Sequence, residues 1–534
     1  MNWKEFLASP QACIIALAAV FIVTRLFAQT PFYYVGVDEG RYLALAQNFP
    51  NHTMHGGTLF LQHMPMYPYF IAITNFILQN DAVAGLFVSF ALDLLLLFIM
   101  ISGFRNLNKS NTWIFLFTLL FALNWALVEF SRIIFKETTY MAFFWAAVMF
   151  YWLGIKKSEK WFWASGIAAV LAAFSSDQVI FLFPIMLLTL FLMPPKHIRW
   201  KAFAPVVLGG LAYAFWLGIR LQFFLTNTAA PIGVDGVIEN VTHFGIGQVL
   251  SPFSFPESVR LTQTAFTIDI PQMASAVGYL FDTYPFLITP NLNWSNVVEL
   301  LKIQNIAFML VWYLPLVIIF AIWLWKAARK NIKEKQYRNN LDLIFFAYFV
   351  ILVIPMFTGV GVMRHIILAV IPVLYFETQA LFMLFNKFME KQPVRVGFVI
   401  LSALFIVCWI IAHPHFTLGS QKIVQGYAVA NELRNLPEDG IFVQTGYSME
   451  LDYLLPEKRV YGIVSDSTNL QKYIKDFNIS YLVLGNKTWA PADEPSLDFI
   501  RSHPELFAPI KTVNERYPIN NIAPDIYTIY RVKK

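Results

Sequence analysis

Residues 82–104 read AVAGLFVSFALDLLLLFIMISGF, which is an almost unbroken apolar run. A helix rises about 1.5 Å per residue, so about 20 apolar residues cross the roughly 30 Å hydrocarbon core of a bilayer. This run is long enough to cross, and similar runs recur along the chain. The stretch therefore predicts a membrane-spanning helix and decides the class of fold.

The composition of the whole chain agrees with that class. Of its 534 residues, 57% are hydrophobic and only 13% are charged, whereas soluble domains carry about 25% charged residues. These values exclude an ordinary soluble protein, a disordered chain and a fibrous one. Cysteine is nearly absent, because only Cys13 and Cys408 are present and both lie in apolar runs. A disulfide framework and a thiolate metal site are therefore excluded.

We predict eleven spans, and we treat one shorter apolar stretch, 66–79, as an interfacial or re-entrant segment because it is only 14 residues long and begins next to Pro65. The predicted spans lie near 11–28, 82–104, 112–130, 137–155, 161–175, 178–193, 201–224, 306–326, 341–358, 364–385 and 395–413.

Loop charge sets the predicted orientation. With a cytoplasmic N-terminus, the cytoplasmic loops hold sixteen Lys and Arg residues, and the opposite loops hold six over far more sequence. This asymmetry obeys the positive-inside rule. A full span at 66–79 would invert every later loop and destroy the asymmetry. The first apolar stretch lacks a small-residue cleavage site, so we expect a retained helix rather than a signal peptide.

The predicted architecture is thus a polytopic α-helical membrane domain, 1–413, with large outside loops at 29–81 and 225–305, followed by a small extracytoplasmic α/β domain, 414–534. A possible amphipathic piece lies at 296–304 in the second loop. Alternating strand and helix patterns indicate the α/β class of the tail. The predicted strands are 441–445, 459–463, 479–485 and 526–532, and the predicted helices are 470–477 and 496–507, the latter broken at Pro504.

The densest group of ionisable residues outside the membrane follows the first span. Asp38 and Glu39 are adjacent, Arg41 and Tyr42 come next, and the pattern from there on is helical. The two acids therefore lie at a helix N-terminus, where the helix dipole favours negative charge. A capping role alone would need only one carboxylate, so we keep a catalytic role for the pair beside the capping one.

Two further groups fall on the same predicted side of the membrane. Arg132, Lys136 and Glu137 lie in the short loop before the fourth span, and Arg364 and His365 open the tenth. The alternative for Glu137 is an ordinary first-turn acid, and the alternative for Arg364 is an arginine that snorkels to the interface. Loop charges alone set the orientation, so the shared side favours one joint site.

Signatures of soluble enzymes are missing from the sequence. It contains no phosphate-binding G-x-x-x-x-G-K-[ST] loop and no H-E-x-x-H motif. His52, His55 and His63 share the first outside loop with Asp38, but their spacing is not diagnostic of a metal site. The sequence predicts no cofactor, and a divalent metal bound by the outside loop is the alternative.

Four segments together resemble a family. DEGRYLALAQN (38–48), MPMYPYFIA (64–72), SRIIFKETTYMAFFWAA (131–147) and MRHIILAVIP (363–372) resemble, in order and spacing, the GT-C superfamily of membrane glycosyltransferases. The branch with protein O-mannosyltransferases and lipid A aminoarabinose transferases is the most similar. The segment QHMPMYP (62–68) departs from the Lys-Pro-Pro typical of the aminoarabinose transferases, which leaves the sugar undetermined.

The resemblance implies inverting transfer of one sugar from a polyprenyl-phosphate carrier to an acceptor hydroxyl outside the membrane. An acidic base near that hydroxyl and cations at the leaving phosphate suit such chemistry. The resemblance then assigns catalysis to Asp38 and Glu39, donor-phosphate binding to Arg364, His365, Arg132 and Lys136, and substrate binding to Glu137, Arg41 and Tyr42.

The expected partners follow from this assignment. They are a polyprenyl-phosphate-linked sugar, a glycan, lipid or protein hydroxyl acceptor, and the lipid bilayer, with no nucleic acid. The expected location is a prokaryotic plasma membrane, with the N-terminus in the cytoplasm and the C-terminal domain outside. The alternatives are a multi-span transporter and a non-catalytic protein of cell-envelope assembly.

Overall fold

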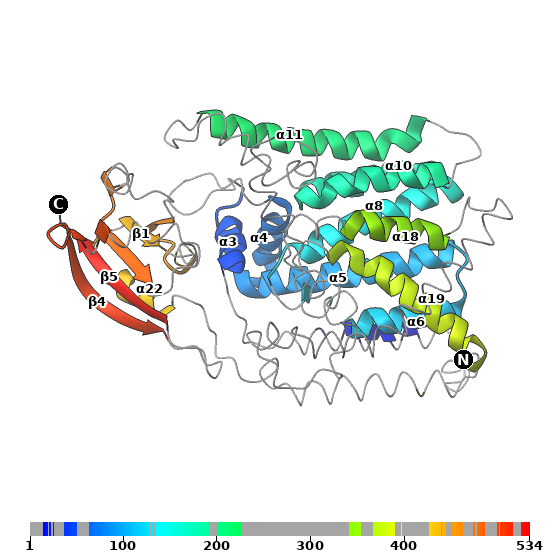
Figure 1. The fold of residues 1–534 in the computed structure, drawn as a ribbon, viewed down its shortest axis with the longest axis horizontal. Coiled ribbons are helices and arrows are strands. Elements are labelled where there is room, and N and C mark those ends of the chain that lie inside the picture. The colour runs from blue at the N-terminus through cyan, green and yellow to red at the C-terminus, as the bar shows by residue number, and fades with distance from the viewer. Residues whose placement is uncertain are drawn as a thin grey trace. The chain divides into compact units, whose positions relative to one another are not determined.

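The computed structural model describes residues 37–50, 64–124, 134–192, 200–226, 341–353 and 367–389, parts of 427–533, and single positions near 14–25, 127–131 and at 397. The chain divides into two compact units. Unit 1 contains 1–26, 90–131 and 136–413, and unit 2 contains 27–89, 132–135 and 414–534. Figure 1 shows the elements of both, and each unit is described by itself.

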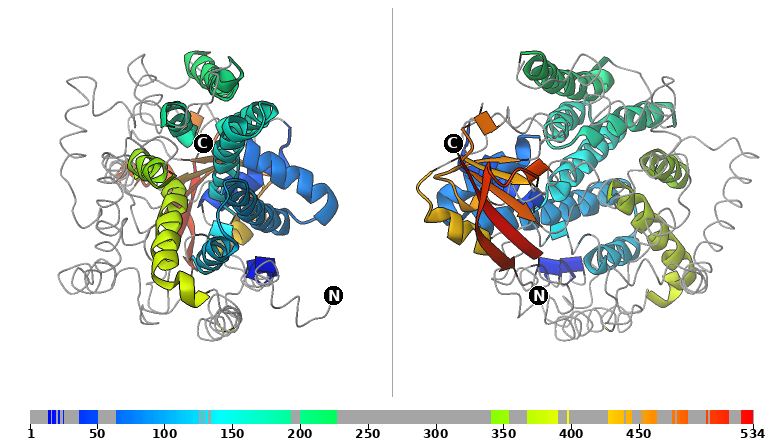
Figure 2. Two further views of the ribbon diagram at one scale, coloured as in Figure 1. Left: turned by 90° about the vertical axis from the view of Figure 1, so that its right-hand side faces the viewer. Right: turned by 60° about the vertical axis from the view of Figure 1, so that its left-hand side comes forward.

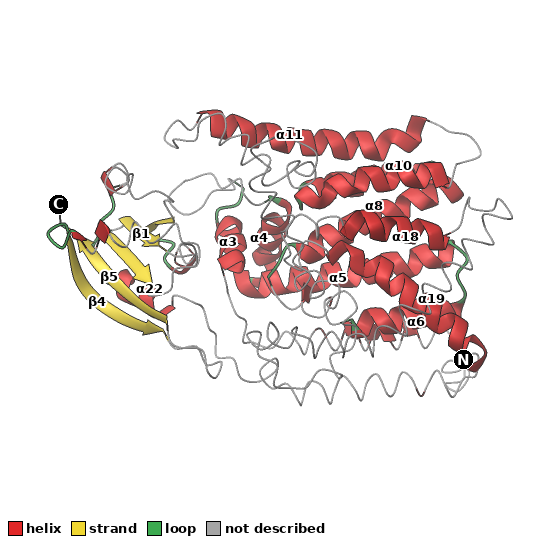
Figure 3. Cartoon of the chain, viewed as in Figure 1, coloured by secondary structure: helices red, strands yellow, loops and turns green. Residues whose placement is uncertain are grey.

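Unit 1 is helical throughout its described part (Figure 3). Helix α5 begins in unit 2 and continues into unit 1. The helices and their bounds are α5 (Asp81–Asn106), α6 (Asn111–Leu123), α8 (Glu137–Lys156), α9 (Lys160–Ala173), η1 (Asp177–Phe181), α10 (Leu182–Leu192), η2 (Trp200–Phe203), α11 (Ala204–Thr226), α18 (Leu341–Val353), η6 (Ile367–Ala369) and α19 (Val370–Met389).

Three helical stretches among the described residues are long and apolar enough to cross a membrane: Asp81–Asn106, Glu137–Lys156 and Trp200–Ile219. In the same described part of the chain, shorter apolar helices occur at six further places, including all of α9 and most of α19. The predicted spans at 306–326 and nearly all of 395–413 lie outside the described residues, so the total of eleven stays a prediction.

Helix α6 ends at Leu123, inside the predicted span 112–130, and positions 127, 130 and 131 are again helical. The next residue, Asn124, adopts an extended conformation, and its side-chain Oδ1 accepts a hydrogen bond from the backbone N–H of Leu127 at 3.1 Å. An asparagine side chain that binds nearby backbone competes with the helical hydrogen bonds. The apolar sequence continues across this site, which is why hydropathy alone missed the break.

Aromatic side chains form the core of unit 1. The Phe345 ring of α18 stacks on the Tyr375 ring of α19, with centroids 3.9 Å apart. Trp152 of α8 meets Phe345 edge to face at 5.3 Å, and its indole N–H donates to the Tyr348 hydroxyl at 2.9 Å. Aromatic pairs of this kind add about 0.5–1.5 kcal/mol beyond their buried area. These contacts therefore hold α8, α18 and α19 together around Phe345.

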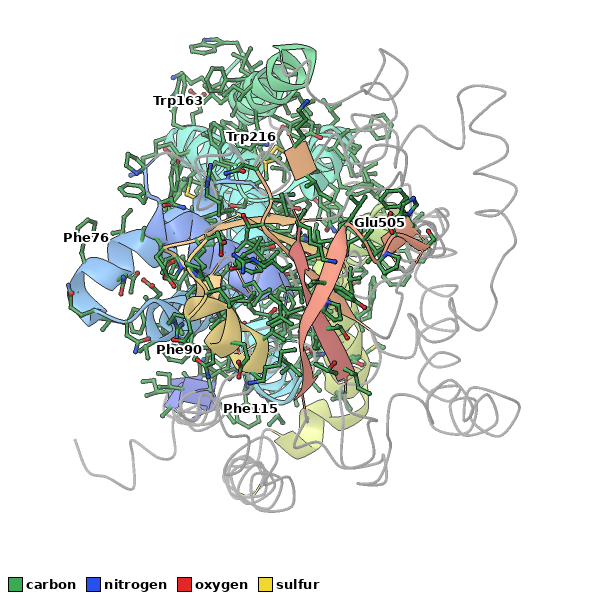
Figure 4. The ribbon with its side chains drawn as sticks, turned by 90° about the vertical axis from the view of Figure 1, so that its left-hand side faces the viewer. Phe76, Phe90, Phe115, Trp163, Trp216 and Glu505 are labelled. Carbon is green, nitrogen blue, oxygen red and sulfur yellow. The ribbon has the colours of Figure 1, made fainter. Side chains whose placement is uncertain are left out.

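The outer face of α11 is apolar and exposed. Val207, Leu211 and Phe215 are exposed at four-residue spacing, which places them on one stripe of the helix. Trp163 of α9 also points outward, as Figure 4 shows. In a chain with membrane-spanning helices, such a surface is suited to lipid contact rather than to water.

Unit 2 contains two short helices and the C-terminal sheet. The helices are α3 (Val37–Gln47) and α4 (Met66–Leu78). One face of α4 is buried, whereas Ile73, Phe76 and Ile77 are exposed, and Phe76 projects outward in Figure 4. Its 13 residues are too few for a full span. The amphipathic character and the short length suit a helix that lies in the membrane interface.

The tail forms one five-stranded sheet in the order β2-β1-β3-β5-β4 (Figures 1 and 2). Strand β1 pairs in parallel with β2 and β3, while β5 pairs antiparallel with β3 and β4. All four predicted strands are confirmed, within two residues of their predicted ends. The bounds are β1 (Gly440–Gln444), β2 (Arg459–Gly462), β3 (Tyr481–Gly485), β4 (Phe507–Glu515) and β5 (Asp525–Val532).

Two elements of the tail differ from the prediction. Strand β4 was not predicted, because Pro509 interrupts its pattern, and the sheet accommodates that residue with a register shift between Pro509 and Lys511. The predicted break of helix 496–507 at Pro504 is confirmed, since helical positions are described only as far as Ser502 and a turn lies at Pro504, but the chain after the turn leads into β4 and not into more helix. Helix α22 (Tyr427–Arg434) was also missed.

Both faces of the sheet are packed. Val429, Ala430 and Leu433 of α22 pack with Ile441 and Val483 on one face. A second cluster, built around Ile479, Leu482, Ile500 and Phe507, covers the other. Gly440 is required at the start of β1, because a Cβ there would lie 2.5 Å from the Asn478 carbonyl oxygen. A sheet covered on both sides is typical of the predicted α/β layer arrangement.

An acid–phenol–arginine cluster fastens β3 and β5 to the turn before β1. The Tyr481 hydroxyl donates to Glu438, and Arg531 Nη2 donates to Glu438 Oε1 at 2.6 Å. The hydrogen bond from Tyr481, and after it the one from Arg531, lowers the pKa of Glu438. Burial, and the hydrogen bond to Glu438, raise the pKa of Tyr481 to about 12. The cluster, in which Tyr481 is buried, Glu438 partly exposed and Arg531 exposed, is therefore a pH-sensitive link within the sheet.

The lowered pKa of Glu438 predicts an acid-dependent loss of protection in the sheet. A group with a depressed folded pKa stabilises the fold above its unfolded value, and the contribution is lost as pH falls through the folded pKa. We expect amide-exchange protection of β3 and β5, measured on the full chain, to fall as pH drops below the ordinary pKa of a glutamate side chain and to fall less in Glu438→Gln. Glu505→Gln, an exposed acid of the same domain (Figure 4), is the control. Identical acid profiles for wild type and Glu438→Gln would contradict this role.

Candidate functional site

The predicted catalytic acids lie in the first turn of α3. The helix begins at Val37, so the expectation that Asp38 and Glu39 open a helix is confirmed. Glu39 is 5% exposed and Tyr42 is 1% exposed, whereas Arg41 is partly exposed. A buried carboxylate at a helix N-terminus is favoured by the dipole and by the free N–H groups of the first turn.

Contacts within unit 2 fix the position of α3. The Tyr42 ring meets the Tyr67 ring of α4 edge to face, with centroids 5.1 Å apart. Tyr67 is held in turn, because its hydroxyl lies 2.8 Å from Ser89 Oγ and 3.3 Å from the Gly85 carbonyl oxygen of α5. Ala44 and Leu45, on α3, form a buried pair against Tyr453 of the tail.

The C-terminal end of α3 is fastened to the start of α5. Gln47 Nε2 donates to Asp81 Oδ2 at 2.7 Å, and the Asn75 amide donates to the other carboxylate oxygen of Asp81. Both oxygens of Asp81 are thus engaged at the N-terminus of a membrane-spanning helix. The acid-bearing helix is therefore held in its middle, at Tyr42, and at its C-terminal end, at Gln47.

The second predicted group opens α8. Lys136 occupies the N-cap position without a side-chain capping bond, and its carbonyl oxygen accepts from the N–H groups of Thr139 and Tyr140. Glu137 is the first helical residue and only 1% exposed. A fully buried acid at the start of a membrane helix is unusual, because ionisable groups are costly there. Its burial distinguishes it from an ordinary exposed first-turn acid.

The remaining predicted site residues, Arg132, Arg364 and His365, lie outside the described residues, as do His52, His55 and His63. The meeting of Asp38, Glu39, Glu137 and Arg364 in one cavity therefore stays a prediction. Within the described part of the chain, no group of three or more His, Cys, Asp and Glu residues is arranged to hold a metal ion.

Sequence reasoning missed one buried ion pair. Arg25 Nε lies 3.4 Å from Asp93 Oδ2, with side-chain exposures of 0% and 1%. Arg25 Nη1 also donates to the Ala122 carbonyl oxygen at 2.7 Å, near the C-terminal end of α6. The available signal was an ionisable residue inside each of two apolar runs, because such residues in membrane helices are rare and usually paired.

A second polar cluster was also missed, because Lys109 was counted only as a loop charge. Its ammonium donates to the Tyr375 hydroxyl at 2.9 Å, and that hydroxyl donates to Asp342 Oδ1 at 2.6 Å. The three residues are far apart in the sequence, so only the fold brings them together.

Comparisons with known proteins find solved structures with a similar fold. No protein-family model matches the chain, and no curated protein matches its sequence. The crystal structure of ArnT from Cupriavidus metallidurans bound to undecaprenyl phosphate matches with a TM-score of 0.54 and 12% identity, over 97% of each chain. The apo state of the same protein matches with a TM-score of 0.44 and 11% identity, also over 97% of each chain.

The match to the undecaprenyl phosphate-bound structure covers the membrane helices and the tail together. At this identity the match concerns the fold. It agrees with the order of the four sequence segments that resembled the GT-C superfamily, and it comes from backbone geometry rather than from those motifs. The chain therefore has the fold of ArnT.

Proposed function

We propose that this protein is an inverting glycosyltransferase that moves a sugar from a polyprenyl-phosphate carrier to an acceptor hydroxyl on the extracytoplasmic side of the membrane. The observation that carries the proposal is the ArnT-like fold over 97% of the chain, since that relative is bound to undecaprenyl phosphate. The helical start at Asp38 and Glu39 agrees with it, because the acids lie on a helix whose C-terminal end is fastened to α5.

The proposed chemistry assigns one duty to each predicted group. Asp38 takes the proton from the acceptor hydroxyl as that oxygen attacks the anomeric carbon, and Glu39 orients the acceptor. The bond to the carrier phosphate breaks on the opposite side, and Arg364 stabilises the charge on that phosphate by bidentate hydrogen bonds. His365, Arg132 and Lys136 act in support at the phosphate, and Glu137, Arg41 and Tyr42 contact the substrates.

Replacement of Arg364 tests the donor assignment. Arg364→Ala should lower transfer from an undecaprenyl-phosphate sugar by about 10–150-fold, because a hydrogen bond to a charged group contributes about 1.5–3 kcal/mol. Arg338→Ala, in a predicted cytoplasmic loop, is the matched control and should change little. The assay uses purified full-length protein in lipid vesicles. Equal transfer from a nucleotide sugar, without any lipid carrier, would overturn the mechanism.

We also propose eleven spans, with the N-terminus in the cytoplasm and the C-terminal domain outside. The loop-charge asymmetry supports this orientation. Single cysteines at 333 and 470 should be labelled by an impermeant reagent from the cytoplasmic and the outer side, respectively. Labelling of 333 from outside, or of 470 from inside, would show that the orientation is reversed.

A further inference from the structure

Helices α9 and α11 lie side by side and run in the same direction. The backbones approach closely, because a Cβ added to Gly209 of α11 would lie 3.0 Å from the Ala169 Cβ of α9. Nearer the start of both helices, the Trp163 ring of α9 meets the Trp200 ring of η2 edge to face, with centroids 5.9 Å apart. The contacts advance along both helices together, so the start of α9 and the start of η2 lie at the same level of unit 1.

One side of this helix pair faces away from the core of unit 1. In the stretch Trp200–Ile219 only 33% of the most apolar window is buried, against 89% for α8, and α11 lies at the rim of the helical unit (Figures 1 and 2). On α9, Lys160, Trp163 and Ile167 are exposed at helical spacing, and Trp163 points outward in Figure 4. Both helices therefore contribute side chains to one outer face.

Both helices show the same order of side chains along this face, with lysine and tryptophan in the first turn and aliphatic groups after them. On α9 the residues are Lys160, Trp163 and Ile167, and on η2 and α11 they are Trp200, Lys201, Phe203, Val207 and Leu211. A phospholipid has the matching order, because its phosphate is followed by the glycerol region, where tryptophan is favoured, and then by acyl chains.

The first turns carry mainly positive charge. Lys156, Lys157 and Lys160 are exposed, and Glu159 is the only acid in 156–160 and 200–203. Glu159 Oε2 lies 3.1 Å from Lys201 Nζ, and Lys157 donates to Asn106 of α5. The Lys160 ammonium has no hydrogen bond or ion pair with any described residue, so it is available to an anion.

These lysines lie at the opposite end of α8 from Glu137. Glu137 is the first residue of α8 and Lys156 the last, 20 residues in all, which corresponds to about 30 Å of helix. That length equals the hydrocarbon thickness of a bilayer, and α8 is apolar enough to cross it. A lipid phosphate bound beside Lys160 would therefore lie at the other membrane surface from Glu137.

We propose that the starts of α9 and η2 form a binding site for one anionic phospholipid of the surrounding bilayer. The residues of this headgroup site are Lys160, Trp163, Trp200 and Lys201. The two ammonium groups bind the phosphate by charge-assisted hydrogen bonds, the indoles lie at the level of the glycerol, and the acyl chains cover the aliphatic residues that follow. The inference does not depend on the proposed sugar transfer.

The charge of the face favours a lipid over a second copy of the chain. A symmetric contact places the same patch of both copies together, so it would bring the lysines of one copy against those of the other. An anionic headgroup instead neutralises them, and each lysine near a membrane surface contributes about 1 kcal/mol to the attraction of anionic lipid, which is a factor of about five in Kd.

The test is native mass spectrometry of the full-length protein in detergent, which measures the Kd of the first bound lipid. The probes are phosphatidylglycerol and phosphatidylcholine with the same acyl chains. The double variant Lys160→Gln, Lys201→Gln should weaken binding of phosphatidylglycerol about 25-fold and leave phosphatidylcholine unchanged. The control Lys157→Gln, Lys511→Gln removes the same charge outside the headgroup site and should bind both lipids as wild type does.

Two single variants test the roles within the headgroup site. Glu159→Gln removes the acid that pairs with Lys201, so it should tighten binding of phosphatidylglycerol. Trp163→Ala should weaken both lipids alike, because the glycerol region is common to them. Phe191→Ala, at an exposed aromatic residue near the end of α10, is its control and should bind as wild type does.

Three outcomes would overturn the headgroup site. The first is wild-type affinity for phosphatidylglycerol in the double variant or, if that variant does not fold, in Lys160→Gln, which breaks no contact between described residues. The second is a loss of undecaprenyl phosphate binding in these variants with phosphatidylglycerol unaffected, which would assign the lysines to a polyprenyl carrier. The third is a wild-type dimer that dissociates in Trp163→Ala, which would show that a second copy covers this face.

Discussion

Asp38→Asn is expected to lower sugar transfer by about 10²–10⁴-fold, which is the usual contribution of a general base. Asparagine has nearly the same shape and keeps an oxygen that can accept from the first-turn N–H groups of α3. It cannot take a proton from the acceptor hydroxyl. The loss should therefore appear in turnover, while the thermal unfolding midpoint of the full-length protein stays close to that of wild type.

The assay for this variant is transfer from an undecaprenyl-phosphate sugar in proteoliposomes. Glu432→Gln is a suitable control, since Glu432 forms an exposed ion pair with Lys511 in the tail and has no role in the proposed chemistry. Full turnover by Asp38→Asn would leave Asp38 only the role of a first-turn acid. Glu39 would then be the remaining carboxylate of the pair to examine.

The buried Arg25–Asp93 pair should give the largest effect on stability. Asp93→Ala would leave the Arg25 guanidinium in an interior where both side chains are almost fully excluded from solvent. Removal of one partner from a buried ion pair costs about 3–5 kcal/mol. We expect this loss in the free energy of unfolding, measured by reversible unfolding of the full-length protein in detergent micelles.

The double variant Arg25→Met, Asp93→Leu distinguishes the cost of an unpaired buried charge from the cost of lost packing. It removes both charges and keeps apolar volume, so it should recover most of the stability lost in Asp93→Ala. Leu95→Ala, at a position of α5 that is 41% exposed, should have a small effect. A loss in the double variant as large as that in Asp93→Ala would mean that packing, and not the unpaired charge, causes the effect.

How far the fold follows from the sequence depends on which interactions determine each element. Hydropathy and helix period predict α5 and α8 well, because lipid and core both require apolar helices there. The end of α6 at Asn124 depends on one side-chain hydrogen bond, which the apolar pattern does not reveal. Strand β4 was hidden by Pro509, which only the register shift of an edge strand makes acceptable.

In the candidate site, too, features set by local sequence could be predicted and features set by packing could not. The first-turn positions of Asp38 and Glu137 could be predicted, because local sequence sets where a helix starts. The complete burial of Glu137, the Arg25–Asp93 pair and the enclosure of Lys109 could not. Each depends on residues that lie tens to hundreds of positions apart, so the partner becomes known only when the helices are packed.

The strand order of the tail has a consequence for biosynthesis. Strand β5 is the last strand along the chain, yet it lies between β3 and β4 rather than at an edge of the sheet. The sheet therefore cannot close until residues 525–532 have been made and have reached the other strands. Until then β3 presents an unpaired edge and β4 lacks its partner strand in the described sheet, which invites pairing with other chains. A ribosome that stops before residue 525 would release a protein with its membrane helices already inserted and an open, aggregation-prone tail, which is a recognisable target for proteolytic quality control.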